Sequence, residues 1–193
     1  MSAVPERFLS LEEYFLLEET GETKHEYYQG AAYAMTGGSL AHNLIVANII
    51  GQLYRQLDGK ACTVYPSDLR LKVEATGLYT YPDVLVICGP ARTADRRNDT
   101  VTNPSVLIEV LSPSTEDYDR GKKFQHYRTI ETLRDYLVIA QDSIHVEHYS
   151  RQEKHQWLLR EFTQTEGVMH LASIGCSLPL AAVYEKVAFD EVE

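Results

Sequence analysis

Two short apolar segments, each with one carboxylate, constrain the fold of this chain more than any other feature. They are residues 81–87 (YPDVLVI) and 105–111 (SVLIEVL), and their carboxylates are Asp83 and Glu109. Runs of this length and composition are typical of buried strands. A buried ionised carboxylate costs several kcal/mol unless a partner compensates it. Two such strands in one small chain predict a shared compensator, and a divalent cation is the obvious one.

A lysine lies where it can reach this pair of strands. Strand side chains alternate between faces, so Glu109 shares one face with Leu107 and Leu111. On the helix expected after Pro113, Lys123 shares a face with Asp119 and with either His126 or Tyr127. If this helix folds back over the sheet, Lys123 returns to the face of Glu109.

This combination of groups is suited to phosphodiester hydrolysis. Asp83 and Glu109 would hold Mg²⁺ or Mn²⁺, helped by the backbone carbonyl of Val110. The cation would polarise a phosphoryl oxygen and lower the pKa of a bound water. The ammonium group of Lys123 would orient a water or stabilise charge that develops on the phosphate.

Each of these strand residues also has a purely structural interpretation. Asp83 follows Pro82, and a strand-entry residue of this kind often forms a hydrogen bond with a neighbouring loop. Glu109 would need a dedicated buried partner, and an ion pair with Lys122 or Lys123 would supply one without metal.

Two further residues have open roles. Glu26, in an expected hairpin, is a candidate accessory ligand that acts through water, or else a solvated strand carboxylate. His42, near the start of an expected helix, would contact phosphate or a ligand, although a surface histidine is the commoner interpretation. The pair His145 and His148 would lie on opposite faces of a strand, which excludes joint ligation.

Local patterns in the first third of the chain predict helices around a hairpin. A capping box at Ser10–Glu13 predicts a helix that ends near Glu19. Residues 26–36 predict a hairpin with its turn at Gly30. A second helix is expected to end near residue 57, because apolar residues recur at three- and four-residue steps. Its apolar stripe would comprise Leu40, Leu44, Ala47, Ile50, Tyr54 and Leu57.

The rest of the chain alternates strands with one long helix. Residues 89–103 are polar and basic, which predicts a mobile surface loop. The long helix is expected from about Glu116 to Ile130. The other elements are strands at 62–65, 68–73 and 136–140, a hairpin of residues 144–149 and 156–162, a strand near Met169 and a helix after Pro179. This order predicts an α/β fold with a mixed central β-sheet flanked by helices.

Composition indicates an ordinary soluble globular protein. The 193 residues predict a single domain, residues 1–193. The hydrophobic content of 44% and the charged content of 24% are typical of such domains. No segment approaches the roughly 18 apolar residues that span a membrane, and residues 1–7 lack the pattern of a signal peptide. We therefore expect neither a membrane partner nor, since phosphate-cradling glycine-rich loops are absent, a small organic cofactor.

The cysteines favour a reducing compartment. Cys62, Cys88 and Cys176 are odd in number and far apart in sequence. This pattern predicts buried free thiols rather than a disulfide framework or a zinc site. The cytoplasm is then the expected location.

The formal net charge of −10 is awkward for a protein that binds nucleic acid, because phosphate binding usually needs a basic face. The basic clusters are modest, and they comprise Arg92, Arg96, Arg97, Arg120, Lys122 and Lys123. Weak or partner-assisted DNA binding is the expectation.

Several segments resemble one known family. The longest runs from E-V-L-S-P-S-T at residues 109–115 through D-R-G-x-K at residues 119–123 to Tyr127. The others are residues 26–30, residues 39–53 with His42, Pro82–Asp83 and residues 135–138. Together they resemble the PD-(D/E)XK restriction-endonuclease-like superfamily, and within it the Uma-type branch of bacterial endonucleases. The resemblance spans about residues 10 to 185.

The resemblance implies a restriction-endonuclease-like sheet and Mg²⁺-dependent cleavage of DNA. It maps Asp83 and Glu109 as metal ligands, Lys123 as the catalytic lysine and Glu26 as an accessory acid. The superfamily usually has its lysine two residues after the acid, where this chain has Leu111. A second departure is Gln29, where the branch more often has Asp before the glycine.

Three functional hypotheses follow. The first is a Mg²⁺- or Mn²⁺-dependent endonuclease that acts as a homodimer, since a two-fold dimer most easily cuts both DNA strands. The second is a module that keeps the nuclease fold and binds DNA or protein without useful turnover. The third is a structural component of a mobile-element or defence system in which a partner supplies DNA binding.

Overall fold

The computed structural model describes residues 7–112 and 115–189 of the chain. In this part, the strands form two six-stranded sheets and one two-stranded hairpin. The helical segments are α1 (Leu11–Thr20), α2 (Leu40–Gln56), α3 (Glu116–Tyr118), the π-helix η1 (Asp119–Lys123), α4 (Phe124–Tyr127) and α5 (Leu180–Val183). The strands are β1 (Arg7–Phe8), β2 (His25–Tyr28), β3 (Ala31–Ala34), β4 (Cys62–Pro66), β5 (Arg70–Val73), β6 (Leu78–Thr80), β7 (Val84–Cys88), β8 (Thr100–Val101), β9 (Val106–Val110), β10 (Asp135–Ile139), β11 (Val146–Glu153), β12 (Gln156–Phe162), β13 (Val168–Leu171) and β14 (Cys176–Pro179).

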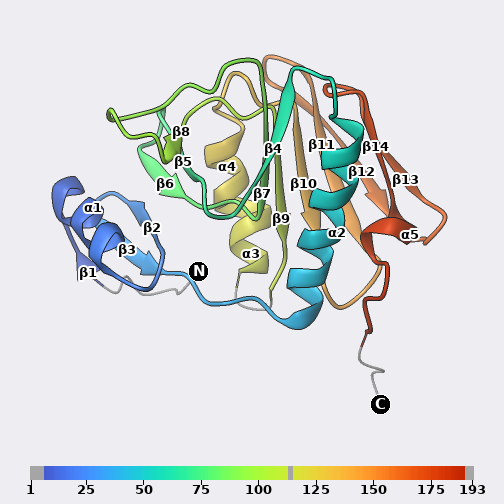
Figure 1. Cartoon of the computed structure of the whole chain (residues 1–193), viewed down its shortest axis with the longest axis horizontal. Helices are drawn as coiled ribbons and strands as arrows, with labels where there is room; N and C mark the ends of the chain where they lie inside the picture. Colours follow the sequence, from blue (N-terminus) through green and yellow to red (C-terminus); the bar gives the residue numbers. More distant parts are fainter. Residues whose placement is uncertain (1–6, 113–114, 190–193) are drawn as a thin grey trace.

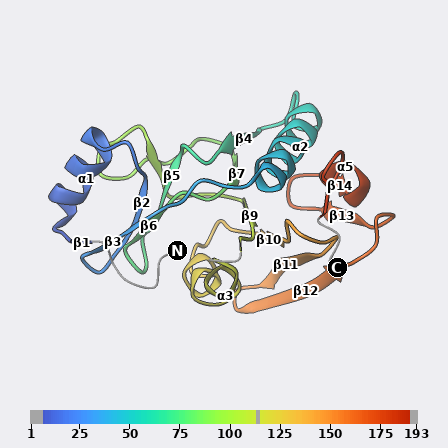
Figure 2. The same ribbon diagram turned by 90° about the horizontal axis from the view of Figure 1, so that it is seen from below.

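The central sheet has the strand order β12-β11-β10-β9-β7-β4. Its strands β9 and β10 are parallel, while the other neighbouring pairs are antiparallel, so the sheet is mixed. Figure 2 shows α2 on one side of these strands and α3 on the other. The predicted α/β fold, with a mixed sheet flanked by helices, is confirmed. The strand that carries Glu109, β9, lies in the interior of this sheet.

Helix α2 covers one face of the central sheet, but with a different stripe from the predicted one. Its fully buried side chains are Ile45, Ile49 and Leu53, which pack on β4 and β9. The predicted stripe members Leu40 and Tyr54 are instead exposed, at 93% and 74%. Apolar residues cover more than one side of this helix, so their spacing alone was compatible with either of two buried faces. The contact with the sheet selects the side with the β-branched isoleucines.

The opposite face of the central sheet packs against the helical segment from α3 to α4. Residues 116–127 are helical but not uniformly so, because Asp119–Lys123 winds as a π-helix between two short α-helices. The segment ends at Tyr127 rather than at Ile130. There the Thr129 hydroxyl donates a hydrogen bond to the His126 carbonyl, and tighter turns replace the helix. Pro113 and Ser114, expected between β9 and this helix, lie outside the described residues.

The second sheet has the order β1-β3-β2-β6-β5-β8. In Figure 1, its strands β1 to β3 and helix α1 form the end of the molecule that lies farthest from α5. The predicted hairpin is present as β2 and β3. Gln29 and Gly30 form its turn with φ values of 49° and 82°, and a short loop with two such residues matches the twist of paired strands. This hairpin carries Glu26.

The basic segment at residues 89–103 is more ordered than the mobile surface loop that composition predicts. Its strand β8 pairs in parallel with β5. Ion pairs fix the segment further: Asp99 contacts Arg70 and Arg97, and Asp95 contacts Lys72. Charged residues of the predicted loop therefore pair with one another and with strand β5.

The cysteine prediction is wrong for two of the three residues. Cys62 and Cys88 form a disulfide between β4 and β7, where they face each other in the strand register. Only the pairing of two strands far apart in sequence reveals this proximity. Cys176 is a buried free thiol, as predicted. The expectation of a cytoplasmic location rested on three free thiols, and the disulfide removes that support.

Among the described residues, no helix combines the length and the apolar character that crossing a membrane requires.

Candidate active site

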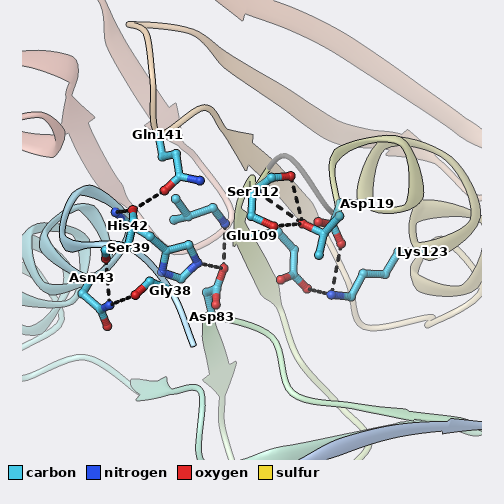
Figure 3. Close-up of polar contacts among 12 residues, drawn as sticks. Gly38, Ser39, His42, Asn43, Asp83, Glu109, Ser112, Asp119, Lys123 and Gln141 are labelled. Carbon is cyan, nitrogen blue, oxygen red and sulfur yellow. Dashed lines mark hydrogen bonds and ion pairs between the residues drawn. The ribbon is translucent and has the colours of Figure 1, made fainter. Parts of the chain in front are cut away.

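The register of the central sheet places Asp83 next to the end of β9. Val84 pairs with Ile108, so the residue before β7 lies across from Glu109. The backbone N–H of Val110 donates a hydrogen bond of 2.8 Å to Asp83 Oδ2. Figure 3 shows the Asp83 and Glu109 side chains from these neighbouring strands. The structure thus brings together the two carboxylates that the sequence singled out. Asp83 also accepts a backbone hydrogen bond, as a strand-entry residue would, but from strand β9 rather than from a loop.

Lys123 lies among three carboxylates on the α4 side of the sheet. Its Nζ is 3.0 Å from Glu109 Oε1, 3.1 Å from Asp119 Oδ1 and 3.2 Å from Glu26 Oε1. All four side chains are nearly inaccessible to solvent. The π-helix bears both Asp119 and Lys123, and π-helical turns are frequent at functional sites. The sequence left Lys122 and Lys123 as candidate partners of Glu109. The structure selects Lys123, as the helix register indicated, because Lys122 is exposed.

Glu26 reaches this cluster from the second sheet. It is 3% exposed, which excludes the solvated strand carboxylate that the sequence left open. The Thr80 hydroxyl donates to its Oε1 at 2.5 Å. Its Oε2 is buried with no hydrogen-bond partner among the described residues. A buried carboxylate oxygen without a partner is costly, so this atom marks a place for a water or a cation.

Two contacts in the site had only weak sequence signals. The Tyr127 hydroxyl donates a hydrogen bond of 2.7 Å to Glu109 Oε1. His42 Nε2 lies 3.2 Å from Asp83 Oδ2. The i,i+4 spacing from Lys123 pointed to Tyr127 only as a face neighbour, and nothing in the sequence linked His42 to Asp83.

Burial and crowding of like charges set the protonation of the cluster. Burial, with the nearby charges of Asp119 and Asp83, raises the pKa of Glu109 to about 8, although Lys123 and Tyr127 oppose the shift. Burial alone would lower the pKa of Lys123, but the carboxylates of Asp119, Glu109 and Glu26 raise it well above 10.5. The lysine is therefore charged at neutral pH. Its single positive charge is smaller than the negative charge that the surrounding carboxylates would carry if all were ionised.

Lys123, the carboxylates of the cluster and His42 line one cavity of about 280 Å³. Four carboxylates border it against a single ammonium group, and they belong to Glu26, Asp83, Glu109 and Asp119. Hard oxygen donors of this kind suit Mg²⁺ or Mn²⁺. Within residues 7–112 and 115–189, no group of three or more His, Cys, Asp or Glu side chains has the geometry to hold a metal ion. A cation here would take two carboxylates and keep several waters, as Mg²⁺ commonly does.

Two arginines of the predicted basic clusters already have acidic partners. Arg97 pairs with Glu19 and Asp99. Arg120 pairs with Glu116 and Glu147. Paired in this way, these guanidinium groups add little to the attraction of a polyanion.

The sequence model of one family, Uma2, described as "Putative restriction endonuclease", matches residues 11–181. The chain belongs to this family. The match covers the central sheet, the second sheet apart from β1, and every residue that lines the cavity. Membership in Uma2 agrees with the restriction-endonuclease-like resemblance of the sequence.

The chain is similar to two proteins of Synechocystis sp. and to one solved structure from Anabaena variabilis. "Uncharacterized protein slr1290" of Synechocystis sp. is 40% identical over 182 residues, which cover 94% of each chain. "Uncharacterized protein sll1609" of the same organism is 37% identical over 155 residues, which cover 80% of this chain and 88% of that one. A crystal structure titled as a putative nuclease of DUF820 from Anabaena variabilis has a TM-score of 0.74, with 19% identity over 93% of this chain and 99% of that one. At this identity, the likeness shows the shared fold alone.

Proposed function

We propose that this Uma2 protein is a Mg²⁺- or Mn²⁺-dependent endonuclease that hydrolyses DNA phosphodiester bonds. The observation that carries the proposal is the convergence of Asp83, Glu109 and Lys123 on one cavity. Two carboxylates on adjacent strands with a lysine nearby suit metal-assisted phosphodiester hydrolysis. The family description supports the same class of reaction.

Asp83, Glu109 and the carbonyl of Val110 would hold the cation. When bound, it would supply Lewis-acid polarisation of a phosphoryl oxygen and a bound water of lowered pKa. Hydrolysis adds water across a P–O bond, so one product keeps the phosphate and the other gains a hydroxyl proton. The charge on Lys123 would be drawn toward the phosphate as negative charge develops there.

The other residues of the cluster keep this lysine in place. Asp119, one helical turn before Lys123, and Glu26 each contact its ammonium group. The hydrogen bond from Tyr127 fixes the Glu109 carboxylate. Such supporting contacts fix the geometry of groups that bind metal and substrate.

A second candidate function is DNA or protein binding without useful turnover, in a mobile-element or defence system. The net charge of −10 and the paired state of Arg97 and Arg120 favour it. A homodimer would help in either case by joining two weak DNA contacts in one particle. Measurement of oligomeric state by light scattering tests the dimer, which a monomer at working concentration would contradict.

Cleavage of supercoiled plasmid in Mn²⁺ separates the two functions. The endonuclease proposal expects nicked and linear products from the wild type, and none with EDTA. Glu109→Gln should lose the activity, while the matched surface change Glu161→Gln should retain it. Plasmid that stays intact with folded, metal-bound wild type would favour the binding function.

A further inference from the structure

His42 contacts Asp83 from the first turn of α2, across the cavity from Lys123 (Figure 3). Its Nε2 lies 3.2 Å from Asp83 Oδ2. A carboxylate oxygen accepts hydrogen bonds, so Nε2 carries the proton in this contact. Both side chains are mostly buried, with 15% and 16% of their surface exposed. The two residues thus form a partly desolvated pair at the edge of the site.

The same Asp83 oxygen receives a second donor. The backbone N–H of Val110 reaches Oδ2 at 2.8 Å. Among the described residues, no hydrogen bond or ion pair engages the other oxygen, Oδ1. Two donors on one oxygen fix the plane of the carboxylate and leave its second oxygen for a ligand. Hydrogen-bonded carboxylates of this kind are typical of metal sites.

Local contacts also fix the backbone that carries the imidazole ring. The Ser39 hydroxyl accepts the backbone N–H of His42 at 3.1 Å, which caps the first turn of α2. The Asn43 side chain bonds the carbonyls of Gly38 and Ser39 at 3.0 and 2.9 Å. The helix start that presents His42 is therefore held from both sides of the residue.

Gly38 leaves the space that the ring occupies. A Cβ atom at Gly38 would lie 2.5 Å from His42 Nδ1, closer than side chains approach. His42 Nδ1 is itself buried with no hydrogen-bond partner in the described part of the chain. Among the described residues, the side-chain partner of the ring is Asp83. Burial lowers the pKa of His42, but Asp83 and the backbone of Val110 are close enough to raise it. Both partners belong to the proposed cation site.

We propose that His42 is a positioning residue that holds Asp83 in the orientation needed to bind the divalent cation. This inference rests on the proposed function, since it assigns a partner to one of its metal ligands. His42 acts through Asp83 and does not itself contact the cation. Its loss should weaken metal binding without removing any ligand atom.

Calorimetric titration of Mn²⁺ into the whole protein tests this role through metal affinity rather than activity. His42→Leu keeps the volume but removes the donor, so Mn²⁺ affinity should fall about 10- to 100-fold. His42→Gln restores an N–H group at a similar reach and should recover most of the affinity. Gly38→Ala displaces the ring and should weaken binding while every polar group remains. Melting temperatures measured without metal establish that each variant folds.

The control is His145→Leu, because His145 Nε2 pairs with Glu161 at the same distance of 3.2 Å but lies outside the cavity. Its Mn²⁺ affinity should equal that of the wild type.

If His42→Leu does not fold, the His42→Gln and Gly38→Ala variants test the proposal instead. Wild-type affinity in every folded variant at Gly38 and His42, with binding lost in Asp83→Asn, would overturn the role of His42 alone. Absence of binding by the wild type would overturn the proposed function as well.

Discussion

Lys123 Nζ lies 3.0 Å from Glu109 Oε1, and both side chains are almost completely buried. The lysine comes from the π-helix and the glutamate from the interior of the central sheet. This ion pair is the structural alternative to a metal site that the sequence left open. The surplus of carboxylates around the pair distinguishes the site, because Lys123 contacts three of them and Asp83 borders the same cavity.

Replacement of Lys123 by methionine tests whether the excess of carboxylates around it can bind a cation. Lys123→Met leaves Glu26, Glu109 and Asp119 without their common cation, and loss of one partner of a buried pair costs about 3–5 kcal/mol. Mn²⁺ should restore part of this loss, so it should raise the melting temperature of the variant more than that of the wild type. Thermal melts with Mn²⁺ and with EDTA measure both effects. An equal increase in the two proteins would argue against a cation in the cluster.

Stability of the metal-free protein should depend on Glu109 protonation. The folded state raises the pKa of Glu109 from 4.5 to about 8, so it binds this proton more tightly than the unfolded chain does. The stability contributed by the protonated group is present in acid and is lost as pH rises between these values. Urea unfolding in EDTA across this range measures the effect. Glu109→Gln should have a flatter profile, and a slope equal to that of the wild type would contradict the assignment.

The Tyr127 hydroxyl should matter for metal binding as well as for stability. Tyr127→Phe removes the hydrogen bond to Glu109 and should cost about 1–3 kcal/mol. The control is Tyr184→Phe, since the Tyr184 hydroxyl bonds the backbone carbonyls of Ala140 and His145 away from the cavity. Both variants should lose stability in urea, but only Tyr127→Phe should also lose Mn²⁺ affinity. Unchanged affinity would leave the hydroxyl with a packing role alone.

Reduction of the disulfide should destabilise the central sheet at β4 and β7. A crosslink between Cys62 and Cys88 typically contributes about 2–4 kcal/mol. Dithiothreitol should therefore lower the urea midpoint of the wild type and leave Cys62→Ser/Cys88→Ser unaffected. Cys176→Ser, which removes the buried free thiol, should remain sensitive to the reductant. A wild type that resists dithiothreitol while its thiols react with a labelling reagent would exclude a stabilising crosslink.

The sequence predicted those parts of the site that depend on local periodicity. Alternation along β9 placed Glu109 with Leu107 and Leu111 on one face, and in the structure this face packs against Tyr127. The i,i+4 spacing paired Asp119 with Lys123. These relationships hold because a strand repeats every two residues and a helix nearly every four.

The features that the sequence missed depend on contacts between distant segments. Glu26 was left between two interpretations because only the position of the second sheet brings it to Lys123. The buried face of α2 was misplaced because apolar residues on several sides made the spacing ambiguous. The π-helix has no comparable pattern, and the partner of Cys62 depends on which strand lies beside β4.

Binding of Mn²⁺ to the wild type and to two isosteric variants tests the central claim most directly. Asp83→Asn and Glu109→Gln each remove one proposed ligand charge and preserve side-chain size. Calorimetry should detect binding to the wild type, with affinity reduced at least about tenfold in both variants. Wild-type affinity in both variants would place the cation elsewhere, and no binding to the folded wild type would make Lys123 and Glu109 a purely structural ion pair.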